Sequence, residues 1–540
     1  MNVSEIVVQR LADSGIEQSF GIPAQSILDI TDAMYRNGSI NFVTVRHEQV
    51  AASMADGYAR VSGIPAVCMA GAGPGSANMV LGVANAYRAS VPMVAITANV
   101  ESKKIGRDSF NEWKQTRIYK SITKHSYRLN NPNLTPNLID RVIRSTVSGR
   151  PGPVHLDIPE DLGYADVKSP SRHHRISLGP SRLAARSGEV KKALEALITS
   201  NSPILMVGGG AVWSGAGDSL LRLAELFSIP VVVSMSARGI IPEDHPLCFG
   251  PSGRWGFSAC NDLVKSADFI LSLGFRFGEW ATNGWTIVPP DVKIAQVDVE
   301  ESEIGRHYPA KIGSLADVKT FIEQMLQIVT LDIRKQKKLT RNGLKRLMEK
   351  LANQRKSFLS SNSGSPVDPR AIIREVMRFK DEDMILTVGA GKHALFASRA
   401  LVMEPRSFLK AGEFGPMTFA FPAGLGAKIA RPDKTVICLI GDGDFMMTVQ
   451  DLETAVRENI AIISVVFNDG CYNAERLPRL EGRNVGVEFT NPDFVKLAES
   501  FGAVGAHISR PADILPVLKR MAKEQIPAVI DVAIDRDAKL

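Results

Sequence analysis

Two apolar runs in the C-terminal third each stop at an acidic turn, and this pattern constrains the fold more than any other feature. The run 435–440 ends at Gly441-Asp442-Gly443-Asp444, and the run 461–467 ends at Asn468-Asp469. Short apolar runs that stop at such turns predict buried strands of a parallel sheet, and the segment 447–457 between them carries helix formers. Because open parallel sheets bind ligands at the carboxyl ends of their strands, we expect Asp442 and Asp469 side by side at one sheet edge.

Two carboxylates at one sheet edge, with a backbone carbonyl nearby, suit a hard cation such as Mg²⁺. Without a cation the two carboxylates would repel each other. A Gly-Asp-Gly sequence can also form an ordinary turn between a strand and a helix, and the short motif alone does not separate the two interpretations. The second acid at a matching strand end favours the metal site.

The whole chain has the composition of a globular protein. Its 540 residues predict about three domains, and 44% of them are apolar. The net charge of +7 comes from scattered basic residues with few aromatic neighbours, so we expect no nucleic-acid partner. No apolar run is long enough for a membrane span, and the first 15 residues predict an amphipathic helix rather than a signal peptide. Five cysteines without a CxxC pair predict reduced thiols in a cytoplasmic protein.

Strands and helices alternate in three segments of the chain, which predicts an α/β fold with three doubly wound parallel sheets. The expected domains are 1–168, 189–330 and 370–540, and they are separated by a polar, Pro/Arg-rich linker at 169–188 and by a second connection at 331–369. The basic stretch 334–350 predicts a solvated helix. Glycines 208–210 of the second segment do not make a full dinucleotide fingerprint.

Glu48 is the strongest candidate for a catalytic acid. It follows the predicted strand 42–45 and has apolar residues on both sides, among them Val45 and Val50. A surface glutamate needs no such setting. The alternative is an exposed acid at a helix start, where the helix dipole favours negative charge.

The motifs around these acids resemble those of thiamine-diphosphate-dependent enzymes, and specifically the large, catalytic subunits of acetolactate synthases. The similarity covers nearly the whole chain, although Asp469 stands where the usual signature has a second Asn, as in some catabolic acetolactate synthases. The matching segments are Phe20–Pro23, Val45–Gln49, Ala55–Arg60, Gly73–Gly75, Ala84–Tyr87, Ile122–His125, Gly149–Pro153, Trp213–Gly217 and Pro242–Pro246.

The resemblance implies a pyrimidine-binding domain (1–168), a central Rossmann-like domain (189–330) and a diphosphate-binding domain (370–540). Glu48 would hydrogen-bond the aminopyrimidine ring of the cofactor, and Asp442, Asp469 and the Cys471 carbonyl would hold Mg²⁺. Met417 would support the bent cofactor, although ordinary core filling is the alternative. His393 could equally be a structural histidine. The implied cofactor-binding residues are Pro23, Gly391, Lys392, His393, Met417, Gly441, Gly443, Asp444 and Phe445.

The implied reaction is a carboligation: a 2-oxo acid such as pyruvate is decarboxylated, and the two-carbon enamine is transferred to a second carbonyl. The substrate side departs from the synthases, with Ala24-Gln25 in place of Gly-Gly and Phe110-Asn111 in place of Phe-Gln. A decarboxylase or carbon–carbon lyase that does not ligate is therefore the alternative. A non-catalytic scaffold is a third, which the intact Glu48 and metal-site acids argue against.

Two further expectations follow from the resemblance. Synthases that hold FAD carry a His in a Gly-Met-His-Gly segment, where this chain has Gly253-Arg254-Trp255-Gly256, and this argues against bound FAD. Because the first and third domains would each supply half of a site, we expect a homodimer or homotetramer with active sites shared between chains.

Overall fold

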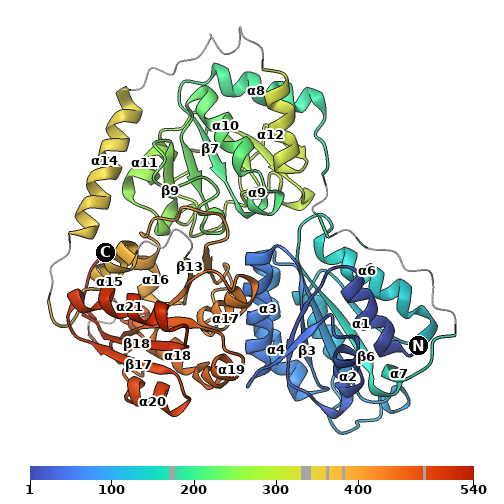
Figure 1. The fold of residues 1–540 in the computed structure, drawn as a ribbon. Coiled ribbons are helices and arrows are strands. Elements are labelled where there is room, and N and C mark those ends of the chain that lie inside the picture. Colours follow the sequence, from blue (N-terminus) through green and yellow to red (C-terminus); the bar gives the residue numbers. More distant parts are fainter. Residues whose placement is uncertain are drawn as a thin grey trace.

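The computed structural model describes residues 1–168, 176, 178–179, 182–329, 342–360, 364–379, 384–477 and 482–540. Three six-stranded parallel sheets follow one another along the chain, each with helices packed around it. In Figure 1 the first unit is blue, the second green, and the third orange to red. The predicted fold class is confirmed.

The first sheet has the strand order β2-β1-β3-β4-β6-β5. Its central strands β3, β4 and β6 are buried along their whole length. The strands are β1 (Gln18–Gly21), β2 (Asn41–Thr44), β3 (Ala66–Ala70), β4 (Met93–Asn99), β5 (Ser126–Arg128) and β6 (Pro153–Pro159); the helices are α1 (Val3–Asp13), α2 (Leu28–Asn37), α3 (Glu48–Ser62), α4 (Pro74–Ala89), α5 (Gln115–Ile122), α6 (Thr135–Val147) and α7 (Glu160–Gly163).

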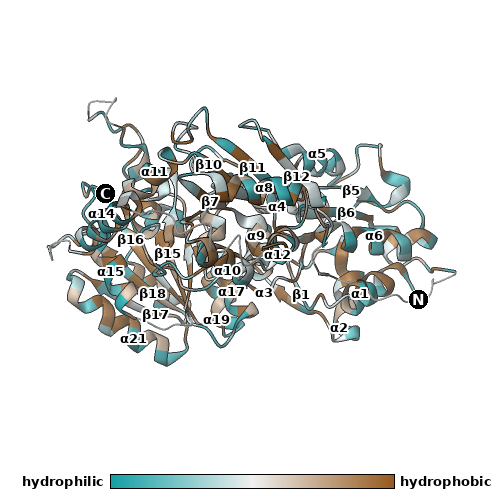
Figure 2. Cartoon of the chain, turned by 90° about the horizontal axis from the view of Figure 1, so that it is seen from above, coloured by the Kyte–Doolittle hydropathy of each residue, from teal (hydrophilic) through white to brown (hydrophobic). Residues whose placement is uncertain are grey.

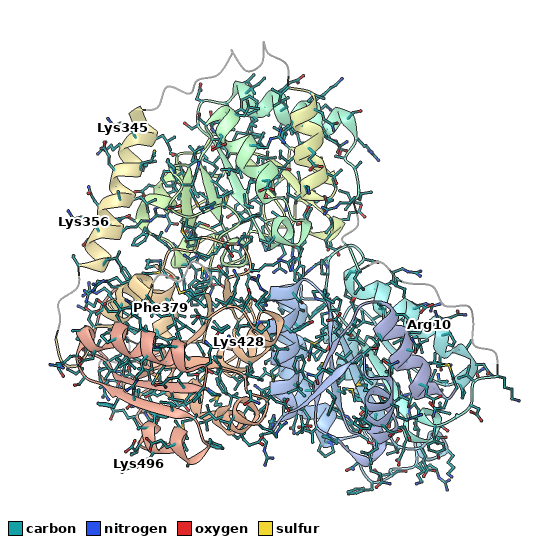
Figure 3. The ribbon with its side chains drawn as sticks, in the orientation of Figure 1. Arg10, Lys345, Lys356, Phe379, Lys428 and Lys496 are labelled. Carbon is teal, nitrogen blue, oxygen red and sulfur yellow. The ribbon has the colours of Figure 1, made fainter. Side chains whose placement is uncertain are left out.

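The second sheet has the order β12-β11-β10-β7-β8-β9 and its own apolar core. Its strands are β7 (Pro203–Val207), β8 (Val231–Val233), β9 (Cys248–Pro251), β10 (Phe269–Leu273), β11 (Lys293–Asp298) and β12 (Ile312–Leu315); its helices are α8 (Ser187–Thr199), α9 (Gly209–Ser214), α10 (Gly217–Phe227), α11 (Ser258–Lys265) and α12 (Val318–Gln327). Helix α14 (Asn342–Leu359) then runs alongside α11 towards the third unit (Figure 1). Lys345 and Lys356 project outward from it, as expected for a solvated basic helix (Figure 3).

The third sheet has the order β14-β13-β15-β16-β18-β17. Its two central strands, β15 (Val436–Gly441) and β16 (Ile462–Asn468), are the two apolar runs predicted from the sequence. The other strands are β13 (Ile385–Val388), β14 (Phe408–Lys410), β17 (Val504–Ile508) and β18 (Ala528–Ala533); the helices are α15 (Pro369–Phe379), α16 (Lys392–Ala397), α17 (Ala420–Ala430), α18 (Asp442–Met446), α19 (Leu452–Arg457), α20 (Phe494–Ser500) and α21 (Ile514–Glu524).

The first and third units share one apolar core, which runs across helices α3 and α17. Glycines allow the two helices to approach closely: a Cβ on Gly57 would lie 2.1 Å from the Ala423 carbonyl oxygen, and one on Gly426 would lie 2.0 Å from that of Met54. Figure 2 shows apolar colour concentrated on the inner strands, whereas peripheral helices such as α15 and α21 carry both colours. The contact between α3 and α17 therefore fixes the first unit against the third.

One local expectation differs from the structure, and two others fall partly outside the described residues. The segment 447–457 is not one helix but a 3-10 turn, Val449–Asp451, followed by α19. The linker 169–188 and the basic stretch 334–350 lie partly outside the described residues. Among the described helices, none is long and apolar enough to cross a membrane.

Candidate active site

The two predicted acids lie at the carboxyl ends of neighbouring strands. In the parallel pair β15–β16, Gly441 is opposite Phe467, so the turns after the two strands meet. The backbone N–H groups of Asp469 and Gly470 donate to Asp442 Oδ2, at 3.2 and 2.8 Å. The structure therefore brings Asp442 and Asp469 together, as the alternation of strand and turn predicts.

The environment of this pair favours a bound cation. Burial raises the pKa of Asp442 and of Asp469, and the charge of Asp442 raises the pKa of Asp469 further. A nearby divalent ion would offset both effects, because an opposite charge favours ionised carboxylates. In the described part of the chain no three His, Cys, Asp or Glu side chains gather as a metal-binding group. Mg²⁺ would therefore take its remaining ligands from backbone carbonyls, water or a diphosphate.

Asp444 has a positioning role in this geometry. Its carboxylate is buried and accepts hydrogen bonds from the backbone N–H of Ala390, at 3.1 Å, and from that of Thr418. These two donors lie on separate loops, one after β13 and one before α17. Burial raises the pKa of Asp444 to about 6. Asp444 thus joins the loop that carries Gly391 to the loop that carries Met417.

A cavity of about 430 Å³ lies between these loops, and residues of the third unit line it. Nine of the predicted site residues are in its wall: Gly391, Lys392, His393, Met417, Gly441, Asp442, Gly443, Asp444 and Asp469. Cys471 also lines it, and its carbonyl accepts a 2.8 Å hydrogen bond from the Asn473 N–H. The sequence therefore predicts ten of the 21 residues in this cavity's wall.

One buried polar atom in this wall has no partner. His393 is 7% exposed, and its Nε2 makes no hydrogen bond within the described structure. Burial, together with the charge of Lys410, lowers the pKa of His393 to about 3, so the ring is neutral at pH 7. Buried polar groups normally have partners, so Nε2 is an unsatisfied polar atom, closed off from solvent, in a residue that lines the cavity. Glycines close the same wall: a Cβ on Gly441 would lie 3.2 Å from His393 Nδ1. The residues present therefore fit an Mg²⁺-bound diphosphate.

Phe445 is not part of this wall. Its side chain is fully buried and packs edge-on against Phe421 and beside Phe494. The residue follows Asp444 on α18, and the turn of the helix directs its ring into the core shared with the first unit. Its side chain contributes to packing, which differs from the expected place at the cofactor.

Glu48 begins α3 in the first unit, directly after the N-cap residue His47. Its Oε2 accepts a 2.9 Å hydrogen bond from Asn78 Nδ2, and a Cβ on Gly75 would lie 3.0 Å from its Oε1. Glu48 is half-buried rather than buried, because the glycine-rich turn before α4 covers only one side of it. The neighbouring Gln49 donates from Nε2 to Thr418 Oγ1 of the third unit.

The predicted substrate-side residues lie in the first unit, and two of them, Ala24 and Asn111, lie against the glycine-rich segment whose Gly75 is beside Glu48. The Ala24 side chain touches Gly71, and the backbone of Asn111 lies against Gly73. Pro23 and Gln25 are exposed, with Gln25 Nε2 3.3 Å from Glu160 Oε1, and Phe110 is 91% exposed. None of these residues lines the 430 Å³ cavity of the same chain. Each unit of one chain thus presents half of the predicted site.

Sequence analysis missed two features of this region. Asn491 donates from Nδ2 to Asp442 Oδ2 at 2.7 Å and to Asn468 Oδ1 at 2.9 Å, although it lies 49 residues beyond Asp442 in the chain. Lys410 lines a second, larger cavity where the three units meet. No local pattern marks either residue, because both act through contacts between distant segments.

The segment that argues against FAD lies in the wall of this larger cavity. Trp255 stacks on Trp280 at 4.7 Å between ring centroids, and Arg254 lies over the outer face of Trp280. Trp280 therefore has protein groups on its ring, although 37% of the residue is still exposed. The absence of FAD stays a prediction.

Three segments of the chain match, in order, three domains of one enzyme family. Residues 1–118 match the thiamine pyrophosphate enzyme N-terminal TPP binding domain, residues 190–325 the central domain, and residues 389–532 the C-terminal TPP binding domain. The chain is 33% identical to the probable acetolactate synthase large subunit of Methanococcus aeolicus, over 100% of this chain and 93% of that protein. It is 32% identical to the acetolactate synthase isozyme 3 large subunit of Escherichia coli, over 98% of this chain and 94% of that protein.

Proposed function

The chain belongs to the thiamine pyrophosphate enzymes, and on that basis we propose that it is a carboligase of the acetolactate synthase type. It would decarboxylate a 2-oxo acid such as pyruvate and transfer the two-carbon unit to a second carbonyl. Similarity to large subunits named acetolactate synthase, over the full length of the chain, supports this activity. The carrying observation is the 430 Å³ cavity, where Asp442 and Asp469, at adjacent strand ends, line one wall together with His393.

When bound, thiamine diphosphate supplies a carbon nucleophile and an electron sink for decarboxylation. The residues of this chain would bind and orient it. Asp442 and Asp469 would hold Mg²⁺ against the diphosphate, and His393 would lie beside the diphosphate in the cavity wall. Met417 would support the ring system from the cavity wall, and the Glu48 carboxyl would hold a proton at the aminopyrimidine ring nitrogen.

We propose that each active site combines the first unit of one chain with the third unit of another. Within one chain, Glu48 and the exposed Phe110 lie outside the cavity that Asp442 lines. A homodimer, or a homotetramer built from it, would bring the two halves together. The proposed domain bounds are 1–168, 189–330 and 370–540. Five buried free cysteines support the reducing cytoplasm as the location.

The test is product analysis with the purified protein, thiamine diphosphate, Mg²⁺ and pyruvate. Acetolactate and CO₂ are the expected products, whereas acetaldehyde and CO₂ alone would support a decarboxylase instead. The Glu48→Gln variant should keep cofactor binding, measured by calorimetry, and lose turnover. If wild-type protein binds the cofactor but consumes no 2-oxo acid, the proposal is wrong.

A further inference from the structure

A cavity of about 690 Å³ lies where the three units meet. It borders the cavity of the metal-site acids, so a molecule in it could reach towards the bound cofactor. Six residues contribute to the walls of both cavities: Ala390, Gly391, Lys392, Gly415, Asn473 and Ala474. The larger cavity is therefore placed to hold the remote part of a substrate.

Lys410 ends strand β14 and lies in the wall of this larger cavity. Its Nζ lies 4.4 Å from the centroid of the Trp255 ring, which itself stacks on Trp280. The side chain is half-buried, and burial, together with the charge of Arg60, lowers its pKa to about 8. Among the described residues no carboxylate lies within ion-pair distance of Lys410. A half-buried cation without a partner, facing a cavity, is typical of a ligand site.

The other charges in the cavity wall are mostly satisfied by the protein. Arg60 pairs with Asp56 at 2.5 Å, Arg150 with Glu303 at 3.3 Å, and Arg476 with Asp537 at 2.9 Å. Lys392 Nζ donates to the Arg536 carbonyl oxygen at 3.1 Å.

Arg276 donates to the Arg88 carbonyl oxygen at 3.0 Å. Neither Arg276 nor Lys410 forms an ion pair with a carboxylate among the described residues, so both remain available to an anion. The acids in the same wall are Asp298 and Glu413. Burial raises the pKa of Asp298 to about 6, and Glu413 lies 3.8 Å from Arg88. Positive charge therefore predominates in the cavity.

We propose that Lys410 selects the second substrate of the carboligation by binding its carboxylate. The acceptor would be a carbonyl compound with an acidic group remote from the reacting carbonyl. The aromatic face of Trp255 would hold the ammonium group in place through a cation–π contact. The inference rests on the proposed carboligase function and names the acceptor class of that same site.

The reaction balances without an added oxidant. The bond between C1 and C2 of the donor 2-oxo acid breaks and CO₂ leaves. A new carbon–carbon bond joins donor C2 to the acceptor carbonyl carbon, and the acceptor carbonyl oxygen takes up one proton. The acceptor carboxylate stays unchanged throughout and serves only for recognition.

The test is a competition between two acceptors of equal chain length. Holoenzyme with pyruvate as donor receives equal amounts of succinic semialdehyde, which carries a carboxylate, and butanal, which does not. The two ligated products are quantified by mass spectrometry, and their ratio does not depend on how much active enzyme is present. Wild-type protein should favour the acidic product.

Lys410→Met should reduce this ratio roughly 10- to 100-fold, the usual effect of losing a hydrogen bond to a charged group. Lys410→Arg should retain most of the preference, because it keeps the charge. Lys356→Met is the matched control: it removes the same charge from exposed helix α14 (Figure 3) and should leave the ratio at the wild-type value.

Two results would overturn the inference, and a third would overturn the proposed function as well. Wild-type protein that ligates both aldehydes without preference would refute an acidic acceptor whether or not any variant folds. An equal ratio in Lys410→Met and wild-type protein would exclude Lys410 as the selecting residue. If wild-type protein forms no ligated product with either aldehyde or with pyruvate itself, the carboligase proposal fails and this inference with it.

Discussion

Asn491 offers the sharpest test of the proposed metal site, because it contacts Asp442 and is not expected to touch the metal ion. Its side-chain amide donates to Asp442 Oδ2 at 2.7 Å and to Asn468 Oδ1 at 2.9 Å. Leucine in its place would keep a similar volume and remove both donors. We therefore predict that Asn491→Leu weakens Mg²⁺ binding while the fold persists.

The expected loss of Mg²⁺ affinity in Asn491→Leu follows from the hydrogen-bond donors around Asp442. Oδ2 accepts from Asn491 and from two backbone N–H groups, and Oδ1 accepts from the Gly443 N–H at 2.8 Å. Asn491 is the foremost contribution that lowers the pKa of Asp442 against burial, so its loss should raise that pKa further. A hydrogen bond to a charged group contributes about 1.5–3 kcal/mol. Loss of a residue that orients a metal ligand typically lowers metal affinity about 10- to 100-fold, which corresponds to a free-energy loss of the same size.

The assay is calorimetric titration of Mg²⁺ into protein saturated with thiamine diphosphate. Asn353→Leu is the control, because Asn353 is exposed on helix α14 and is not among the residues that line the 430 Å³ cavity. Circular dichroism and thermal unfolding would establish that each variant is folded. An unchanged Mg²⁺ affinity in folded Asn491→Leu, or an equal loss in Asn353→Leu, would refute the assignment.

Three further predictions test the assembly, the histidine and the packing. Mixing the inactive variants Glu48→Gln and Asp442→Asn should restore roughly 25% of wild-type activity if active sites are shared between chains. After subunit exchange half of the dimers contain one chain of each variant, and one of the two sites in such a dimer is intact. No recovery of activity after subunit exchange would contradict shared sites. In the folded protein the pKa of His393 is lowered to about 3, so as the pH falls the unfolded protein takes up a proton on this ring before the folded protein does. The free energy of unfolding therefore decreases as the pH falls below about 6.5. Between about pH 6.5 and 4, the free energy of unfolding of His393→Gln, measured by urea titration, should therefore fall by about 3 kcal/mol less than that of the wild-type protein. Gly57→Ala places a Cβ 2.1 Å from the Ala423 carbonyl oxygen and should destabilise the protein by about 1–3 kcal/mol in thermal unfolding; an unchanged midpoint would show that α3 and α17 can separate.

The acidic pair could be predicted because its signals are local. An apolar run and the turn after it determine where β15 and β16 end, and parallel pairing then brings Asp442 to Asp469. The alternation of strands and helices likewise predicts three parallel sheets. These features need only the nearest residues in the chain and the known geometry of parallel strands.

Features that depend on tertiary contacts could not be predicted in the same way. The segment 447–457 contains helix formers, yet a 3-10 turn interrupts it where buried Asp451 accepts a hydrogen bond from the Arg46 N–H of the first unit. Phe445 follows the motif acids in sequence, but the apolar core at Phe421 takes up its ring. Packing overrode local helix propensity in the segment 447–457. Packing likewise determines the position of Phe445, whose place at the cofactor was expected from the motif.

Lys410 shows the same limit for function. A single lysine at the end of a strand carries no signal in a sequence, since most lysines are exposed and solvated. Only the fold reveals that its amine lies on Trp255 in a cavity shared by three units. Residues that define the cofactor site fall in motifs because several backbone and side-chain groups must act together. Residues that select a substrate can change one at a time, so they must be found from the cavity they face.

The arrangement of the units explains why one chain presents two separate half-sites. Helices α3 and α17 bury the faces on which the first and third units meet, and glycines at the contact leave no room for movement there. Glu48, at the N-terminus of α3, is not among the residues that line the 430 Å³ cavity of its own chain. If Glu48 has the proposed catalytic role, it would act in the proposed metal site of another chain, and we therefore expect activity to depend on assembly.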